Sequence, residues 1–143
     1  AAIVSLRIAQ KQHSGSINED IMDAVAEYLG IPAIFVYEVA TFYDMLELKP
    51  VGKHKLSICT NLSCQLCGSE KIVAALRERL GIGLGETTAD GVITLKEVEC
   101  MAACDGAPMC QLDDEEYMMG LTAESVVALV DRLYAEQGEV NED

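Results

Sequence analysis

Four of the six cysteines stand as two close pairs, and cysteine sulfurs at such spacings bind metals or exchange electrons. Cys59 and Cys64 have four residues between them, and Cys100 and Cys104 have three. Each pair follows an apolar run and is followed by turn residues. If the two runs are neighbouring parallel strands, their carboxyl ends meet at one edge of a sheet and the sulfurs converge. Four converging thiolates need a cation, so we expect a metal centre there.

The spacing of these pairs favours an iron–sulfur cluster over a single zinc ion. Four cysteines give the closed tetrahedral site of a structural zinc, but zinc knuckles typically have two residues between their cysteines. The wider loops suit a larger group, in which two irons and two sulfides take two thiolates per iron. A zinc-stabilised interaction module with no redox role remains the alternative from a different class.

Cys67 and Cys110 leave a second ligand assignment open. Cys59, Cys64 and Cys67 have the opening spacing of plant-type ferredoxins, which add one distant cysteine. That choice also gives a two-iron cluster, but it leaves the second pair half used. We therefore prefer the assignment that takes one pair from each loop. Cys67 and Cys110 are then spare, and we interpret both as buried small side chains.

Two other kinds of cysteine site fit less well. Cys64 and Cys67 form a CxxC ahead of Ser69 at a helix start, an arrangement that lowers a thiol pKa in thiol–disulfide oxidoreductases. In that case the remaining cysteines have no purpose. A Rieske centre needs two histidine ligands, and His13 and His54 lie outside the cysteine loops.

A helical segment is predicted for residues 1–49, before the residue pattern changes near Pro50. Apolar residues at helical spacing mark a first helix that ends by Gly15. Ser16 and Glu19 then have the form of a capping box, which predicts the start of a second helix.

A third helix is predicted after the second helix ends at Gly30. Pro32 suits the first turn of this helix, which continues through residues 33–46. Most of the seven aromatic residues of the chain are concentrated in this region. We expect the aromatic face of the helix to pack or dock on a large surface; that face consists of Phe35, Phe42 and Tyr43.

A second domain is predicted for residues 50–143, where apolar residues begin to alternate. The expected elements are a strand at 54–59, a helix capped by Ser69 and ended by Gly81, a hairpin or strand pair around 87–100 with its turn at Asp90 and Gly91, two short strands flanking Asp113 and Asp114, and a last helix capped by Thr122. This order favours a small thioredoxin-like α/β unit, so the fold class of the whole chain is predicted to be α+β.

Composition narrows the possible partners. Ten Lys and Arg stand against 24 Asp and Glu, a formal net charge of −14, so we expect no nucleic-acid binding. No apolar run approaches the length of a membrane span, so no direct membrane insertion is expected. The glycine-rich run at 81–86 follows a helix instead of joining a strand to a helix, so we expect no nucleotide on this chain alone. Because the sequence enters within an amphipathic helix, we expect further residues upstream of Ala1.

The sequence from about Val39 to Leu121 resembles the two-iron subunit of respiratory complex I, the 24 kDa or thioredoxin-like ferredoxin subunit family of NADH:quinone oxidoreductase. The resemblance rests on EVATFY (38–43), PVGKHKLSIC (50–59), TTADGVITLKEVEC (87–100) and CMAACDGAPM (100–109), and GIPAIFVYEV extends it upstream. Family members commonly have other residues at the positions of Cys67 and Cys110, and their N-terminal helical segment is longer.

The resemblance implies a thioredoxin-like domain that holds one [2Fe-2S] cluster and has no catalytic residue of its own. The ligands that it implies match Cys59, Cys64, Cys100 and Cys104. It also implies a subunit of NADH:quinone oxidoreductase, inactive alone, that exchanges single electrons with the FMN of an NADH-binding flavoprotein subunit in the peripheral arm. FMN and NADH then belong to that partner only.

The implied location is cytoplasmic, at the inner face of a bacterial plasma membrane, or on the matrix side in mitochondria. Soluble NAD-linked formate dehydrogenases and hydrogenases contain a module that this chain also resembles, so they remain alternative hosts. The loop glycines Gly68 and Gly106 have two interpretations: they let backbone amides approach sulfur, or they only permit turns. An acidic protein around an anionic cluster should lower its reduction potential.

Overall fold

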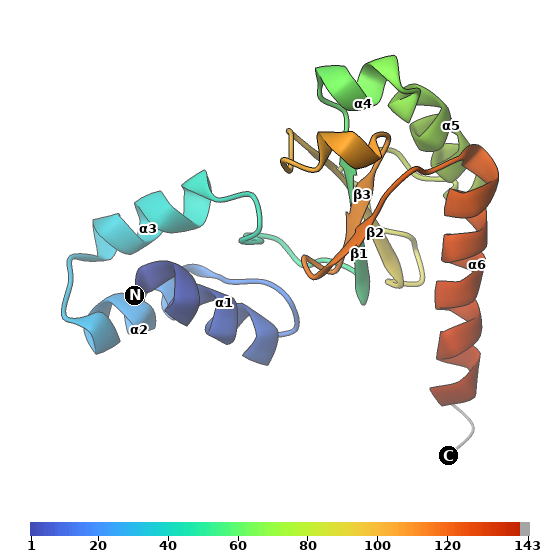
Figure 1. Ribbon diagram of the computed structural model, residues 1–143. Helices are drawn as coiled ribbons and strands as arrows, with labels where there is room; N and C mark the ends of the chain where they lie inside the picture. Colours follow the sequence, from blue (N-terminus) through green and yellow to red (C-terminus); the bar gives the residue numbers. More distant parts are fainter. Residues whose placement is uncertain (141–143) are drawn as a thin grey trace. The chain divides into compact units, whose positions relative to one another are not determined.

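The structure, a computed structural model, describes residues 1–140. The chain divides into two compact units, one from Ala1 to Val51 and the other from Gly52 onward. The first unit consists of helices, and the second contains the sheet (Figure 1). Residues 141–143, which belong to the predicted second domain, lie outside the described residues.

Three helices form the first unit: α1 (Ala2–Gln12), α2 (Glu19–Leu29) and α3 (Ala33–Phe42). Each helix places apolar residues three or four positions apart, so one side of each faces a common core. The buried members of this core are Leu6, Ile17, Met22, Val25, Ala26, Val36, Ala40 and Leu46. The predicted helical segment is therefore present.

Gln10 ties the end of the first unit to α1. Its side chain is only 9% exposed; Nε2 donates to the carbonyl of Met45 at 3.0 Å, and Oε1 accepts from the N–H of Glu47 at 2.7 Å. The carbonyl of Glu47 in turn accepts from the N–H of Ile17 at 2.8 Å. Because the buried amide has partners on both sides, it fixes the segment after α3 without an unsatisfied polar group.

The start of α2 differs from the prediction. Asn18 caps this helix, because its Oδ1 accepts from the N–H of Ile21 at 3.0 Å. The predicted capping box from Ser16 to Glu19 is wrong: Asn is itself a preferred capping residue, and Asn18 lies directly before the helix. The predicted end is confirmed, since Gly30 adopts the left-handed conformation there.

α3 is shorter than predicted. It ends at Phe42 instead of continuing to residue 46, because Tyr43 adopts an extended backbone. The N–H of Leu46 bonds to the carbonyl of Tyr43 at 3.0 Å, and this turn brings the Leu46 side chain into the core. Burial of this leucine is worth about 2 kcal/mol, which favours the turn over further helix.

A four-stranded sheet forms the centre of the second unit. Its strands are β1 (His54–Cys59), β2 (Ile93–Val98), β3 (Cys110–Leu112) and β4 (Glu116–Met118), in the order β2-β1-β3-β4. β1 and β2 are parallel, with Cys59 opposite Val98, whereas β3 runs antiparallel to β1 and β4 to β3. The parallel pair that the cysteine argument requires is therefore confirmed.

Helices α4 (Leu62–Leu66), α5 (Ser69–Leu80) and α6 (Ala123–Val140) and the 3-10 turn η1 (Cys104–Gly106) complete this unit. α5 lies between β1 and the parallel β2 in the chain, and it packs on α6 and the sheet. The shared core consists of Leu56, Ile58, Ile72, Leu76, Val92, Ile93, Leu95, Cys110, Leu112, Val126, Leu129, Val130 and Leu133. β1 and β2 alternate apolar and polar residues: Leu56, Ile58, Ile93 and Leu95 belong to this core, and the polar Lys55, Ser57 and Thr94 are buried as well.

Of the two helix caps predicted in this unit, the first is wrong and the second is confirmed. Ser69 is the buried first residue of α5 and not its cap; the residue before it is Gly68, with a left-handed φ of 98°. Thr122 precedes α6 and caps it as predicted, because its Oγ1 accepts from the N–H of Ser125 at 3.1 Å and its own N–H donates to Ser125 Oγ at 2.8 Å. The short helix α4 was not predicted.

The predicted turns are present. Asp90 Oδ1 accepts from the N–H of Val92 at 3.0 Å, although the hairpin before β2 is reduced to a single bridge between Thr87 and Thr94. The turn between β3 and β4 contains Asp113, whose two carboxylate oxygens accept from the N–H of Lys55 at 2.7 Å and contact His54 Nδ1 at 2.9 Å. Within residues 1–140, no helix has the length and apolar character needed to span a membrane.

Candidate metal centre

The four cysteines of the preferred assignment lie at the carboxyl ends of the parallel strands. Cys59 is the last residue of β1, and Cys64 follows on α4. Cys100 comes two residues after the end of β2, and Cys104 begins η1. Because β1 and β2 are hydrogen-bonded neighbours, both loops leave the same edge of the sheet. The four cysteines were predicted to lie together because the carboxyl ends of neighbouring parallel strands share one edge of a sheet.

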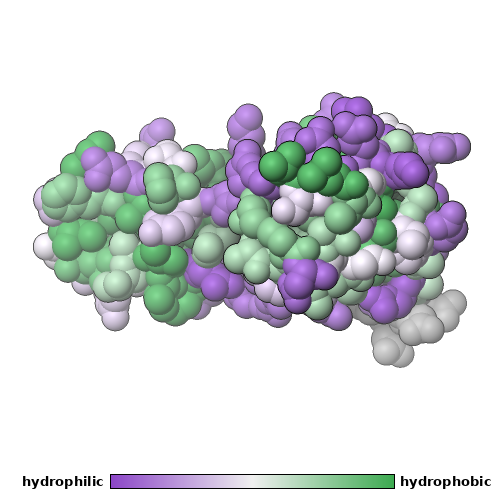
Figure 2. Space-filling view, turned by 45° about the horizontal axis from the view of Figure 1, so that its top comes forward, coloured by the Kyte–Doolittle hydropathy of each residue, from purple (hydrophilic) through white to green (hydrophobic). Residues whose placement is uncertain are grey.

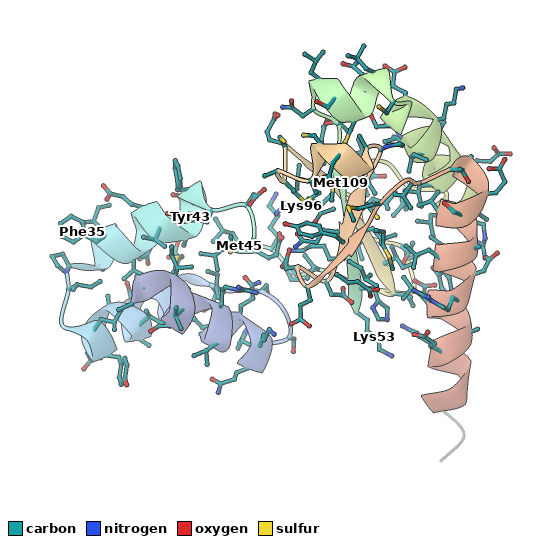
Figure 3. All side chains as sticks on the ribbon, viewed as in Figure 1. Phe35, Tyr43, Met45, Lys53, Lys96 and Met109 are labelled. Atoms are coloured by element: carbon teal, nitrogen blue, oxygen red, sulfur yellow. The ribbon has the colours of Figure 1, made fainter. Side chains whose placement is uncertain are left out.

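Cys59 and Cys64 form the buried side of the site. Their side chains are 2% and 1% exposed and are hydrogen-bonded to each other. They pack against Met109, with Met101, Ala103 and Ala107 at the edge of the same cluster. Met109 lies beside the η1 turn at the end of the sheet (Figure 3). These apolar side chains keep water from one half of the site.

Cys100 and Cys104 form the exposed side. Their sulfur atoms are 3.3 Å apart, and the N–H of Ala102 donates to Cys100 Sγ at 3.4 Å. The hydroxyl of Ser63 hydrogen-bonds to the Cys104 side chain, and Cys104 also interacts electrostatically with Cys59. Cys104 therefore links the exposed pair to the buried one.

The pKa values of Cys64 and Cys100 are shifted in opposite directions. Burial, followed by the hydrogen bond that the Cys64 thiol makes to Cys59, raises the pKa of Cys64 to about 11. The N–H of Ala102, followed by the side chain of Cys104, lowers the pKa of Cys100, and the proximity of Cys100 raises that of Cys104. Cys100 thus supplies a thiolate readily, whereas Cys64 needs a nearby cation to lose its proton.

Cys67 and Cys110 differ from each other. Cys110, on β3, is fully buried in the main core of the second unit, and burial raises its pKa to about 12. It is the buried small side chain that was predicted. Cys67 is exposed at the end of α4, so the same interpretation is wrong for it: the outward side of this short helix faces solvent.

The loop glycines do not approach sulfur through their amides. The N–H of Gly68 bonds to the carbonyl of Gln65 at 3.0 Å, and that of Gly106 to the carbonyl of Ala103 at 3.1 Å. Gly68 permits a left-handed turn, and Gly106 permits close packing of Met119, since a Cβ there would overlap the Met119 side chain. The N–H of Ala102 donates to Cys100 Sγ instead, which residue type alone did not indicate.

The thiols form two pairs at the same edge of the sheet, and Cys104 interacts electrostatically with Cys59. Among residues 1–140, no three or more His, Cys, Asp or Glu side chains form a group ready to hold a metal ion. The chemistry of the donor set, four soft sulfurs of which two are packed among apolar side chains, fits an iron–sulfur group.

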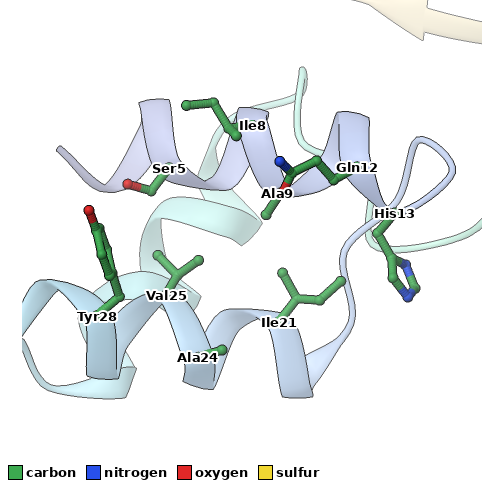
Figure 4. Close-up of a pocket in the computed structure, with 9 residues that line it drawn as sticks. All are labelled: Ser5, Ile8, Ala9, Gln12, His13, Ile21, Ala24, Val25 and Tyr28. Carbon is green, nitrogen blue, oxygen red and sulfur yellow. The ribbon is translucent and has the colours of Figure 1, made fainter.

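A separate groove lies in the first unit between α1 and α2 (Figure 4). It encloses about 540 Å³ and is lined by Ser5, Ile8, Ala9, Gln12, His13, Ile21, Ala24, Val25 and Tyr28. His13 is its single imidazole, and no second metal-ligating side chain lines it. The groove therefore does not compete with the cysteine site for metal chemistry.

Most of the chain resembles proteins of one family. Residues 1–134 match the family described as thioredoxin-like [2Fe-2S] ferredoxin. An NADH-quinone oxidoreductase subunit from Rhizobium meliloti is 43% identical over 135 residues, which are 94% of this chain and 79% of that protein. The corresponding NADH-quinone oxidoreductase subunit from Pseudomonas aeruginosa is 44% identical over 117 residues, which are 82% of this chain and 70% of that protein.

A eukaryotic relative and a solved structure extend the likeness. The mitochondrial NADH dehydrogenase [ubiquinone] flavoprotein 2 of Dictyostelium discoideum is 41% identical over 133 residues, which are 93% of this chain and 53% of that protein. The crystal structure of an air-oxidized NAD+-reducing [NiFe]-hydrogenase aligns with a TM-score of 0.75 at 18% identity, over 97% of this chain and 24% of that one. The hydrogenase likeness shows the fold alone. By its match over nearly its whole length, the chain belongs to the thioredoxin-like [2Fe-2S] ferredoxin family.

Proposed function

We propose that this chain is the electron-transfer subunit of an NADH–quinone oxidoreductase and that Cys59, Cys64, Cys100 and Cys104 hold its [2Fe-2S] cluster. The observation that carries the proposal is the meeting of two cysteine pairs at the ends of the parallel strands β1 and β2, in a chain of this family. The relatives above 40% identity are named as subunits of NADH dehydrogenases, which favours this host over a hydrogenase.

Each cysteine pair would hold one side of the cluster. When bound, a [2Fe-2S] cluster with four thiolates stores one electron, its total charge changing from −2 to −3. The buried pair, Cys59 and Cys64, is fixed by the sheet and by Met109. The exposed pair, Cys100 and Cys104, lies on the loop that follows β2.

Three donors of this chain stabilise negative charge on the sulfurs. The Ala102 N–H points to Cys100 Sγ, the Ser63 hydroxyl bonds to Cys104, and the backbone N–H of Met109 bonds to Cys64. Hydrogen bonds to ligand sulfurs favour the reduced state and raise the potential, whereas burial and nearby carboxylates lower it. The net charge of −14 and the burial of Cys59 and Cys64 therefore oppose the three donors, and the potential is set by their balance.

The electron donor is proposed to be a flavoprotein subunit that carries FMN and binds NADH, within the peripheral arm of the complex. The chain has no catalytic role of its own in this account, because its site contains sulfur ligands and hydrogen-bond donors but no group placed to move hydride. In a bacterium the complex would hold the chain at the inner face of the plasma membrane, and in a mitochondrion on the matrix side.

Metal analysis with spectroscopy tests the proposal. The purified chain should be brown, contain iron and acid-labile sulfide in equal amounts, and lose visible absorption on addition of dithionite. NADH should reduce it only when the flavoprotein subunit is present. A colourless protein that contains zinc, or a cluster that NADH never reduces through the flavoprotein, would contradict the proposal.

A further inference from the structure

Two leucines are exposed beside the cysteine site. Leu62 is 65% exposed and Leu66 is 80% exposed, although leucine side chains are usually buried. They are four residues apart on α4, so they lie on the same face of the helix, one turn from each other. Cys64 lies between them in sequence and points to the opposite, buried side. We call these two residues the α4 leucine pair.

The α4 leucine pair has an acidic border. The side chain of Asn61 donates to Glu99 Oε2 at 2.6 Å, and Gln65 donates to Glu70 Oε1 at 3.3 Å. Thr60 donates to Glu97 Oε1 at 2.7 Å. Two cations lie nearby on α5: Lys71 in its first turn, and Arg77, which lines a pocket together with Glu70 and Glu97. Figure 2 shows a patch of strongly hydrophobic side chains on the second unit, with hydrophilic side chains along its upper border.

The same hydrogen bonds help to hold α4 in a fixed position. A helix of five residues is too short to be stable by itself. Its start is held by the Asn61 side chain, which also accepts from the N–H of Leu62 at 2.8 Å, and its centre is anchored by buried Cys64. The leucines are therefore presented in a fixed position, which lowers the entropy cost of binding through them.

We propose that the α4 leucine pair is the docking surface for the flavoprotein subunit, and that it enters an apolar patch of that subunit bordered by Lys or Arg. The inference rests on the proposed function. α4 carries Cys64, so a protein seated on this helix lies close to the cysteine site. An exposed apolar centre with a charged rim is the usual anatomy of a protein interface.

The charges on the chain favour this occupant over a second copy of itself. Two copies meeting through α4 would bring Glu70, Glu97 and Glu99 of each against those of the other, in a chain of net charge −14. Like charges brought together in an interface oppose association. A partner with a basic border is instead attracted, and its association should slow as salt is raised.

Cys67 supplies a probe of this surface in the natural chain. It follows Leu66 directly and is exposed, whereas Cys110 is buried and the other four cysteines are the proposed cluster ligands. Iodoacetamide should therefore modify Cys67 first in the cluster-loaded chain. Addition of the flavoprotein subunit should slow this modification at least about tenfold, because docking would cover the end of α4.

Leu62→Asp and Leu66→Asp test the leucines themselves. Each should weaken binding of the flavoprotein at least about tenfold and restore alkylation of Cys67, with the reduced-cluster spectrum unchanged. Leu48→Asp is the matched control, since Leu48 is a leucine that is also exposed, at 45%, but lies in the first unit. It adds the same charge and should leave affinity and protection unchanged.

The outcomes separate the two proposals. If the cluster-loaded wild-type chain binds the flavoprotein, but Cys67 stays reactive and both α4 variants bind normally, docking through α4 is wrong while the proposed function holds. If the wild-type chain does not bind the flavoprotein, the proposed function and the docking surface are both wrong. Dimerisation of the chain that Leu66→Asp abolishes, without any effect on flavoprotein binding, would identify a second copy as the occupant and overturn the inference.

Discussion

The backbone N–H of Ala102 donates to Cys100 Sγ at 3.4 Å, and Ala102 reaches this position with a left-handed φ of 59°. A left-handed backbone costs a residue with a side chain about 1–2 kcal/mol. The loop between Cys100 and Cys104 therefore adopts a strained conformation in which an amide faces the sulfur. Strain of this kind is typical of positions that a functional site determines.

Substitutions at Ala102 should separate the amide from the side chain. Ala102→Gly keeps the amide and relieves the left-handed strain, so the cluster should be retained at least as firmly as in the wild type. Ala102→Val places a β-branched side chain at positive φ, and we expect this to destabilise the loop conformation by roughly 1–3 kcal/mol. The rate of bleaching in a strong iron chelator measures the effect. Equal rates for the two variants would show that the left-handed backbone does not hold the site.

Gly106→Ala should destabilise the second unit by about 1–3 kcal/mol, because a Cβ at this position would overlap Sδ of Met119. The two segments cannot easily separate, since the N–H of Gly120 donates to the Gly106 carbonyl at 2.7 Å and that of Leu121 to the Pro108 carbonyl at 2.9 Å. Met119→Gly should remove most of the penalty of Gly106→Ala, because it removes the Met119 Cβ, 2.6 Å from the added Cβ, together with Cγ and Sδ. Denaturant unfolding of both single variants and the double variant gives the coupling, and strictly additive effects would contradict this account.

Removal of the cluster should leave thiols that react in a defined order as pH rises. The Ala102 N–H, and then Cys104, lower the pKa of Cys100, so this cysteine forms thiolate at lower pH than an ordinary thiol. Burial raises the pKa of Cys64 to about 11 and that of Cys110 to about 12, so both stay protonated near neutral pH.

Because the thiolate is the nucleophile, iodoacetamide should modify Cys100 at lower pH than Cys64, and Cys110 last. Mass spectrometry of the apo chain, alkylated across a pH series from about 6 to 9, measures the order. Modification of Cys64 ahead of Cys100 would contradict the described hydrogen bonding.

The aromatic face of α3 is only partly used within its own unit. Phe42 is 80% exposed and Phe35 is 53% exposed, whereas Tyr43 packs on the core of the first unit and meets Phe42 edge-on, with ring centroids 5.1 Å apart. We expect Phe35 and Phe42 to contact another subunit, so amide exchange across residues 35–42 should slow in the complex with the flavoprotein. Unchanged exchange there would show that this face does not bind that partner. Phe42→Ser should leave the stability of the isolated chain nearly unchanged.

Some of the fold followed from the sequence because local signals agreed with the final contacts. The bounds of β1 were predicted correctly, since the alternating run 54–59 is also a strand buried on both faces. The meeting of the cysteine pairs followed from one assumption, that two strands are parallel neighbours, and the register of β1 with β2 bears it out.

Other features depend on contacts that no local pattern contains. α4 is too short to show helical periodicity, and its exposed leucines give no amphipathic signal. The left-handed Ala102 is an ordinary alanine in sequence. The role of Gly106 depends on Met119, which lies in the segment between β4 and α6. At α2, Ser16 and Asn18 are both good caps, and only the path of the chain decides between them.

The central claim is that Cys59, Cys64, Cys100 and Cys104 hold one [2Fe-2S] cluster and that Cys67 does not. Serine lacks the soft sulfur donor that iron prefers, so Cys104→Ser should abolish the cluster or change its spectrum strongly. Cys67→Ser alters an exposed side chain, and we expect both the spectrum and the stability to remain close to those of the wild type. The direct measurement is electron paramagnetic resonance of the two reduced variants. The account predicts a normal signal for Cys67→Ser and a lost or altered one for Cys104→Ser, and the reverse result would contradict it in favour of the plant-type ligand set.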